Sequence, residues 1–245
     1  MRFRLALWIW LAAMLGAVAV TVLVLPQLSA EMPVPLPAPL WLIALASCLQ
    51  SAVLLGLCTW AGVALAPRLG FRAPAFEAAA AGRPILHELR PQLRPGLLVG
   101  APSGLVLLLG TRLAPTEITA LAGRFEPPIL ARLLYGGITE EVLMRWGVMT
   151  VLTWLLWRFV QRGGEVRPAS VWIAIVASSL VFGFGHLPVA KYLLGELTPS
   201  TLTWVIGANT WFGLLFGWLY WRRGLESAMV AHATTHLVNY LAGRL

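Results

Sequence analysis

Charged side chains are scarce in this sequence, and aspartate is absent from it. Asp, Glu, Lys and Arg together make up 11% of the 245 residues, and all 10 acidic residues are glutamates. Soluble domains carry about 25% charged residues, so this composition excludes an ordinary soluble domain. Because 59% of the residues are hydrophobic, we predict an integral membrane protein that crosses the bilayer several times.

Cysteine is also rare, which limits disulfide and metal chemistry. Cys48 and Cys58 lie in one apolar segment, separated by a rise of about 15 Å along a helix. That separation is too long for a disulfide within the helix, and the two residues form no metal-binding pair. The sequence contains no HExxH motif, no internal repeat and no basic run with interleaved aromatic residues. The net charge of +8 therefore does not indicate nucleic-acid binding.

Long apolar stretches, by contrast, occur along the whole chain. A helix needs about 20 such residues to cross roughly 30 Å of hydrocarbon. The sequence therefore predicts an all-α, polytopic transmembrane helix bundle with seven or eight spanning helices. The first apolar window is longer than the roughly 7–15 residues of a cleavable signal peptide, so we expect a retained anchor helix. The windows are Leu5–Leu25, Leu40–Leu65, Pro95–Leu113, Pro128–Phe159, Ala169–Leu187, Leu202–Trp221 and Leu225–Leu241.

We expect these spans to form one integral membrane domain with two parts. Residues 1–127 supply N-terminal transmembrane helices, and residues 128–245 supply a core that carries several polar motifs. The stretch 67–95 has an alanine-rich middle and spaced apolar residues, which predicts an amphipathic helix on the cytoplasmic surface. If the N-terminus lies inside, most arginines fall in cytoplasmic loops, so we predict that orientation.

The fourth span contains charged residues where the bilayer disfavours them, in the stretch "GGITEEVLMRWG" that begins at Gly136. Each ionised group at the centre of a spanning helix costs about 2.5–3.5 kcal/mol on insertion scales. Glu141 and Arg145 lie at helical spacing on one face, so we expect them to form an ion pair. Glu140 points about 100° away and has no such partner. A free carboxylate in a low-dielectric cavity is suited to accept a proton as a general base.

Histidines occur in two further spans, each at a helical spacing. Phe182 and His186 share one face of the fifth span, and Pro188 is expected to end that helix. His232 and His236 share one face of the last span. A lone intramembrane histidine is more often a packing residue than a catalyst, and the ion pair of the fourth span alone would suit a structural role. Taken together, acids and histidines on three helices predict a site that encloses water.

These three motifs resemble those of the CAAX-protease and bacteriocin-processing family, also called the abortive-infection family. That family carries Glu-Glu-x-x-x-Arg, Phe-x-x-x-His and His-x-x-x-Asn/Asp on three separate transmembrane helices. The corresponding stretches here read "EEVLMR", "FGFGH" and "HATTH", in the same order. The resemblance covers Pro128–Leu245. It departs from the family pattern at His236, which stands where the family has asparagine or aspartate.

The resemblance implies an intramembrane endopeptidase, similar to type II CAAX prenyl endopeptidases, that hydrolyses CAAX-type or bacteriocin-like substrates. Its expected setting is a bacterial inner membrane. Its expected partners are membrane lipid and a membrane-associated peptide or protein substrate, with no nucleic acid. Transferred motif by motif, the implied catalytic residues are Glu140, Glu141, Arg145, His186, His232 and His236.

Two chemical roles remain open for these residues. In the first, Glu140 takes a proton from a water molecule that His186 orients. His232 and His236 then stabilise the developing oxyanion. In the second, Glu140, His186 and His232 hold a divalent metal ion such as zinc, with one coordination position left open. The family is commonly described as metalloproteases, yet all these groups can also act without metal.

Two other classes of protein would also place Glu, Arg and His within the membrane. A proton-coupled transporter needs such residues near the midplane, although transporter folds often show internal repeats, which this sequence lacks. A non-proteolytic membrane scaffold or immunity protein would keep the motifs for folding alone, and the departure at His236 favours this alternative. Peptide cleavage that is lost on Glu140→Ala would distinguish a protease from both.

Overall fold

Helices make up most of the computed structural model, which describes residues 1–30 and 36–244. Within those ranges no strand occurs, so the all-α prediction is confirmed. The elements, in chain order, are α1 (Arg2–Leu23), α2 (Leu25–Ala30), α3 (Leu40–Leu69), α4 (Pro74–Ala80), α5 (Ile85–Arg112), α6 (Thr116–Arg124), α7 (Ile129–Ala131), η1 (Arg132–Glu140), η2 (Val142–Met149), α8 (Thr150–Leu155), η3 (Leu156–Val160), α9 (Pro168–Gly185), α10 (Leu187–Leu194), α11 (Pro199–Arg223) and α12 (Leu225–Ala242).

Five helical stretches are long and apolar enough to cross a membrane. Each of them overlaps one of the predicted windows. The other two predicted windows are also helical, from α7 to η3 and in α12, but they carry the charged and imidazole side chains of the motifs. The prediction of seven spans is therefore not confirmed by length and composition. The five stretches are Arg2–Ala30, Leu40–Leu69, Ile85–Arg112, Pro168–Leu194 and Pro199–Arg223.

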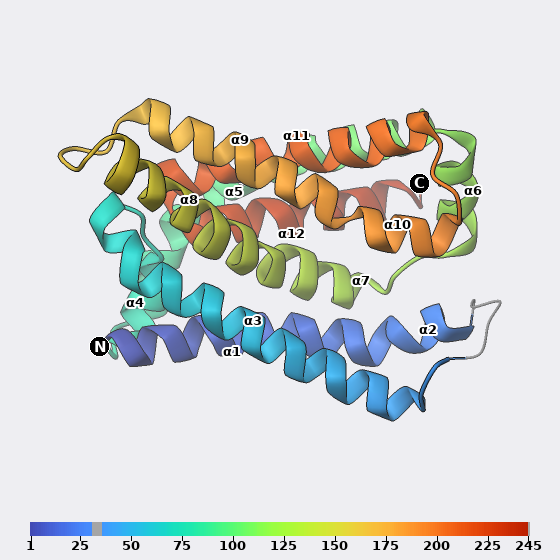
Figure 1. Ribbon diagram of the computed structural model, residues 1–245, viewed down its shortest axis with the longest axis horizontal. Coiled ribbons are helices and arrows are strands. Elements are labelled where there is room, and N and C mark those ends of the chain that lie inside the picture. The colour runs from blue at the N-terminus through green and yellow to red at the C-terminus, as the bar shows by residue number, and fades with distance from the viewer. Residues whose placement is uncertain (31–35, 245) are drawn as a thin grey trace.

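The long helices lie side by side along the long axis of the molecule, with the two termini near opposite ends (Figure 1). α1 packs against α3, α9 packs against α11, and α5 packs against α12. The helix formed by α7, η1, η2, α8 and η3 is the central one, because η1 contacts both α1 and α12 while η2 contacts both α3 and α9. The "GGITEE" stretch therefore lies inside the bundle.

Hydrogen bonds to neighbouring backbones hold the central helix in place. Thr139 Oγ1 donates to the carbonyl of Ala13 in α1 at 2.6 Å. Trp146 Nε1 donates to the carbonyl of Thr59 in α3 at 3.2 Å. Such interhelical bonds contribute about 0.6 kcal/mol each on average inside a membrane. Because they lie on either side of the Glu140 position, they fix the depth and rotation of that residue.

The central helix is wound more loosely than an α-helix in the segments η1, η2 and η3, where the hydrogen bonds are of the i→i+5 type. At the end of η3, for example, Gln161 N–H donates to the carbonyl of Leu156 at 2.8 Å. Such π-type turns are rare and occur frequently at functional sites. The spacing of the motifs predicts a regular α-helix, so this loose winding differs from the prediction.

The stretch 67–95 is divided among three helices rather than forming one amphipathic helix. α3 continues to Leu69 and ends where Gly70 adopts a left-handed conformation, with φ of +72°. The short helix α4 then occupies Pro74–Ala80, and α5 begins at Ile85. Glycine is well suited to the left-handed position because it lacks a Cβ atom, which explains the break after α3.

The prediction that Pro188 ends the fifth span is wrong. α9 ends at Gly185, but α10 begins again at Leu187 with Pro188 in its first turn. Proline is tolerated there because the first N–H groups of a helix have no intrahelical acceptor. His186 therefore lies at a break inside the 27-residue stretch Pro168–Leu194, and not at its end.

Candidate active site

Glu140, at the end of η1, faces two histidines from two other helices. Its Oε1 lies 3.9 Å from Nε2 of His186, and its Oε2 lies 3.8 Å from Nε2 of His232. Both separations are too long for direct hydrogen bonds. The Glu140 side chain is 16% exposed, whereas the adjacent Glu141 side chain is 0% exposed. Glu140 is therefore the acid of the pair that a substrate can reach.

Glu141 connects a histidine to an arginine in the buried layer behind Glu140. Its Oε1 accepts a hydrogen bond from Nδ1 of His232 at 2.8 Å, and its Oε2 lies 3.2 Å from Nε of Arg145. Arg145 also donates through Nη2 to the carbonyl of Gly213 at 3.1 Å. The expected ion pair is thus present, and it places a negative charge against the His232 ring.

The bonds made by Nδ1 direct Nε2 of both histidines toward Glu140. His186 Nδ1 lies 2.8 Å from the carbonyl oxygen of Phe182, which can only accept, so this nitrogen carries the hydrogen. His232 Nδ1 donates to the Glu141 carboxylate in the same way. Because the bond at one ring nitrogen sets the role of the other, both Nε2 atoms remain available on the Glu140 side.

Ring stacking fixes the planes of the two histidines of α12. The His232 ring stacks on Phe216 with centroids 4.7 Å apart, and on its other face it stacks on His236 at 4.9 Å. The Arg145 guanidinium carbon lies 5.3 Å from the centroid of the Phe182 ring. The aromatic partners surround the charged groups with low-dielectric material, which strengthens their mutual interactions.

Two consecutive glycines allow η1 to approach α12 closely. A Cβ atom at Gly136 would lie 2.6 Å from Nε2 of His236. A Cβ atom at Gly137 would lie 2.8 Å from the Cβ of Ala233 and 3.2 Å from its Cα. Small residues at such crossings are typical of membrane helix packing. The spacing between Glu140 and the α12 histidines therefore depends on the absence of side chains here.

We expect Gly137→Ala to destabilise the folded protein by about 1–3 kcal/mol, because the backbone of α12 has to move to admit the methyl group. Thermal unfolding of the purified protein in lipid nanodiscs measures the change. Gly185→Ala is the matched control, since a Cβ atom there meets nothing within 4 Å. Equal stabilities for the two variants would contradict the close helix crossing.

An open cavity of about 280 Å³ lies in front of Glu140. Its wall includes Glu140, His186, His232 and His236, so three helices contribute polar atoms to one space. Glu141 and Arg145 do not line the cavity and instead support His232 from behind. The structure thus brings all six residues singled out in the sequence into one region.

The cavity also contains polar side chains that the sequence analysis left out. Asn209 of α11 lines it, and its Nδ2 donates to the carbonyl of Val205, which leaves Oδ1 free for other bonds. Tyr135 of η1 lines it as well. In the sequence, Asn209 stands out as a single amide within an apolar span. An amide in lipid costs free energy unless it forms hydrogen bonds, so its presence there indicates a polar environment. Tyr135 directly precedes the glycine pair, and nothing else marked it.

Residues 124–238 match the family model described as Type II CAAX prenyl endopeptidase Rce1-like. This stretch is similar to that family. It covers just under half of the chain and contains all three motifs, so the family resemblance predicted from the sequence is confirmed. Comparisons with curated proteins and with solved structures gave no match.

The Rce1-like match supports a protease of the CAAX type as the kind of function. It also implies a membrane context and a membrane-associated peptide as the kind of substrate. The five apolar helices long enough to span a bilayer agree with this setting, so the protein is an integral membrane protein.

The predicted metal ligands Glu140, His186 and His232 lie together at the cavity. Among the residues that the structure describes, no group of three or more His, Cys or acidic side chains is arranged to hold a metal ion. Glu140 lies 3.8–3.9 Å from the two Nε2 atoms that would complete such a set with it. Oxygen and nitrogen ligands of zinc each lie about 2.0–2.2 Å from the ion in a tetrahedral arrangement. Two such ligands lie about 3.4 Å from each other, close to the 3.8 Å and 3.9 Å gaps at Glu140, so these three residues would hold a zinc ion after a small adjustment. A bound ion would supply Lewis-acid activation of water, and no step below passes through a metal.

Proposed function

We propose that this protein is an intramembrane endopeptidase that hydrolyses peptide bonds of membrane-associated substrates, with Glu140 as the general base. One observation carries the proposal. The two oxygens of a partly exposed carboxylate face the Nε2 atoms of His186 and His232 across gaps of 3.9 Å and 3.8 Å, at the wall of an open cavity. This is the arrangement expected around an activated water molecule.

The gaps around Glu140 suit a bridging water. One water makes hydrogen bonds of about 2.8 Å to each of its neighbours, so it can join two atoms that are up to about 5.6 Å apart. His186 carries its hydrogen on Nδ1, so its Nε2 accepts from the water and orients it. Glu140 then removes a proton as the water oxygen attacks the carbonyl carbon of the substrate.

The bonds of the buried layer suggest the role of His232. Its Nδ1–H donates to Glu141, and its Nε2 faces Glu140 at the cavity. In its imidazolium form the ring also carries a hydrogen on Nε2, and this N–H donates to the oxyanion of the tetrahedral intermediate.

The proton that Glu140 takes from the water is used in the last step. Collapse of the tetrahedral intermediate breaks the C–N bond, and Glu140 returns its proton to the leaving nitrogen. His236, which stacks on His232 and lines the cavity, offers a second imidazole N–H to the oxyanion where the family pattern has an amide or an acid. We propose that the histidine replaces the family residue as a hydrogen-bond donor.

Cleavage in isotopically labelled water tests the proposal. The purified protein in nanodiscs is incubated with membrane-anchored peptides, prenylated and unprenylated, in H₂¹⁸O, and the products are analysed by mass spectrometry. We expect a new C-terminal carboxylate that contains one ¹⁸O atom. The same rate is expected after chelation of divalent metals, because no step requires a metal ion.

Each alternative predicts a different outcome of that experiment. Loss of cleavage on chelation, with recovery on added zinc, would establish the metal mechanism instead. Proton-coupled solute flux in liposomes without cleavage would indicate a transporter. No cleavage, together with unchanged cellular function of Glu140→Ala, would indicate a scaffold or immunity protein. A bacterial inner-membrane location is part of the proposal and is tested by fractionation of the source cells.

A further inference from the structure

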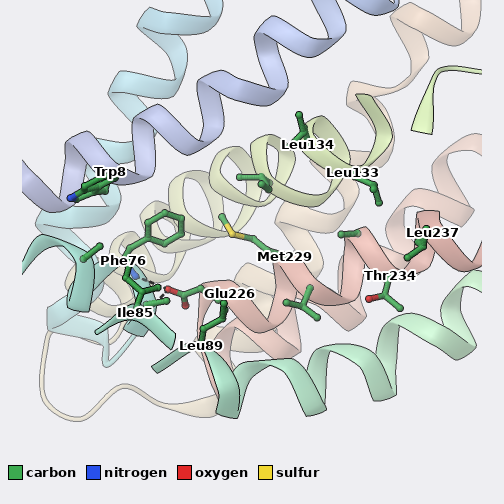
Figure 2. A pocket seen from close by; sticks show the side chains of 15 residues that line it. Trp8, Phe76, Ile85, Leu89, Leu133, Leu134, Glu226, Met229, Thr234 and Leu237 are labelled. Atoms are coloured by element: carbon green, nitrogen blue, oxygen red, sulfur yellow. Dashed lines mark hydrogen bonds between the residues drawn. The ribbon is translucent and has the colours of Figure 1, made fainter. Parts of the chain in front are cut away.

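A second hollow lies between α1, α4, α5, η1 and α12, and it shares no lining residue with the cavity beside Glu140 (Figure 2). Its volume is about 540 Å³, within the range of about 300–1,000 Å³ found for small-molecule sites. Ala233 lines this hollow and packs against Gly137, and the neighbouring Gly136 lines the cavity beside Glu140. We call this hollow the α12 groove.

The walls of the α12 groove are almost entirely apolar. Phe76 of α4, Leu89 of α5, Leu133 of η1 and Met229 of α12 lie around it (Figure 2). Its rim is open to the outside of the bundle, where Trp8 is 47% exposed. In a membrane protein such exposed apolar side chains face lipid, so a molecule that enters the groove comes from the bilayer.

One acidic residue, Glu226, lies among these apolar side chains. Its Oε1 accepts hydrogen bonds from the backbone N–H groups of Ala75 at 2.8 Å and Phe76 at 3.0 Å. Its Oε2 is buried and has no hydrogen-bond partner, and the residue is only 3% exposed. A buried carboxylate oxygen without a donor carries the full cost of its lost hydration. The groove thus contains an acceptor that the fold itself leaves unsatisfied.

We propose that the α12 groove binds a single-chain membrane amphiphile whose head group donates a hydrogen bond to Oε2 of Glu226. The hydrocarbon chain lies along η1 and α12, between Leu133 and Met229, and leaves through the open rim. A primary ammonium or a hydroxyl group supplies the donor. A carboxylate head is disfavoured because in its ionised form it has no hydrogen to donate to Oε2 of Glu226.

Quenching of tryptophan fluorescence measures this binding directly, because Trp8 lines the groove. The probes are three octadecyl chains that carry bromine at mid-chain and differ only in the head: an amine, an alcohol and a carboxylic acid. We expect saturable quenching by the amine, the alcohol or both, and at least about tenfold weaker binding of the acid. The Trp8→Phe variant should lose the saturable component and so assign it to this residue.

Two variants separate ligand binding from folding. Glu226→Gln keeps an oxygen for the N–H groups of α4 and should weaken amine binding about tenfold. Ala79→Phe fills the groove and should abolish saturable quenching by every probe, whereas Ala46→Phe, on an exposed face of α3, should not. Equal affinity for the acid, or quenching that survives Ala79→Phe in a folded protein, would overturn the proposal.

Discussion

Replacing Glu140 by glutamine is expected to lower kcat for peptide cleavage by about 10²–10⁴-fold, the usual contribution of a general base. The amide has the shape of the carboxylate but cannot remove a proton from water. KM should change little, because the cavity keeps its volume. Steady-state kinetics on a cleaved peptide measure both values, and the thermal unfolding temperature should stay near that of the wild type, since Glu140 makes no direct hydrogen bond to His186 or His232.

The control for this variant is Glu88→Gln. Glu88 pairs with the exposed Arg83, and neither residue lines the cavity beside Glu140. Exposed ion pairs contribute about 0–1 kcal/mol, so the variant should retain activity and stability. Retained cleavage by Glu140→Gln would contradict the role of Glu140 as the base.

Replacing Arg145 by methionine is expected to lower the free energy of unfolding by about 3–5 kcal/mol, the cost of removing one partner from a buried ion pair. The variant leaves the Glu141 carboxylate buried without its counter-charge and leaves the carbonyl of Gly213 without its donor. Denaturant titration or thermal unfolding in nanodiscs gives the value.

Two comparisons test whether that loss comes from the stranded charge. Adding Glu141→Gln to Arg145→Met should recover part of the stability, because the amide oxygen still accepts from His232 and no charge is left unpaired. Arg72→Met removes the exposed partner of Glu77 and should cost no more than about 1 kcal/mol. If Arg145→Met costs no more than Arg72→Met, the buried pair does not stabilise the fold.

Much of the helical layout follows from hydropathy alone. The window beginning at Leu40 starts at the first residue of α3, and the last window coincides with α12 to within one residue. Apolar side chains that face lipid or a packed core leave little choice of secondary structure inside a membrane. The count of spans does not follow, because the central helix and α12, which carry two of the three motifs, are not among the helices that qualify by length and composition.

The residues of the candidate site could be predicted because residues four positions apart in the sequence lie on one face of a helix in the structure. His232 and His236 share a face in the sequence, and their rings stack in the structure. The spacing does not show which acid each histidine meets. Only the packing of α12 against the central helix shows that His232 Nδ1 binds Glu141 while Nε2 faces Glu140.

Other features depend on contacts between distant segments, which no local pattern encodes. The i→i+5 winding of η1 and η2 occurs where the central helix packs against α1, α3, α9 and α12. The spacing of residues within one helix does not predict it. Glu226 lies next to the first residue of the last apolar window and belongs to none of the three motifs. Its bonds to Ala75 and Phe76 join segments 150 residues apart, so its position in a groove became visible only once the chain was folded.

The first helix borders the cavity beside Glu140 even though it lies outside the stretch that matches the family. Val20 and Val24 line the cavity, and Ala13 receives the hydrogen bond of Thr139. The shape of the space next to Glu140 is thus partly determined by a segment that supplies none of the chemistry. If the proposed hydrolysis takes place here, substitutions in this aliphatic wall would change substrate preference while the reacting groups stay untouched, and a detached C-terminal half would lack one side of the cavity.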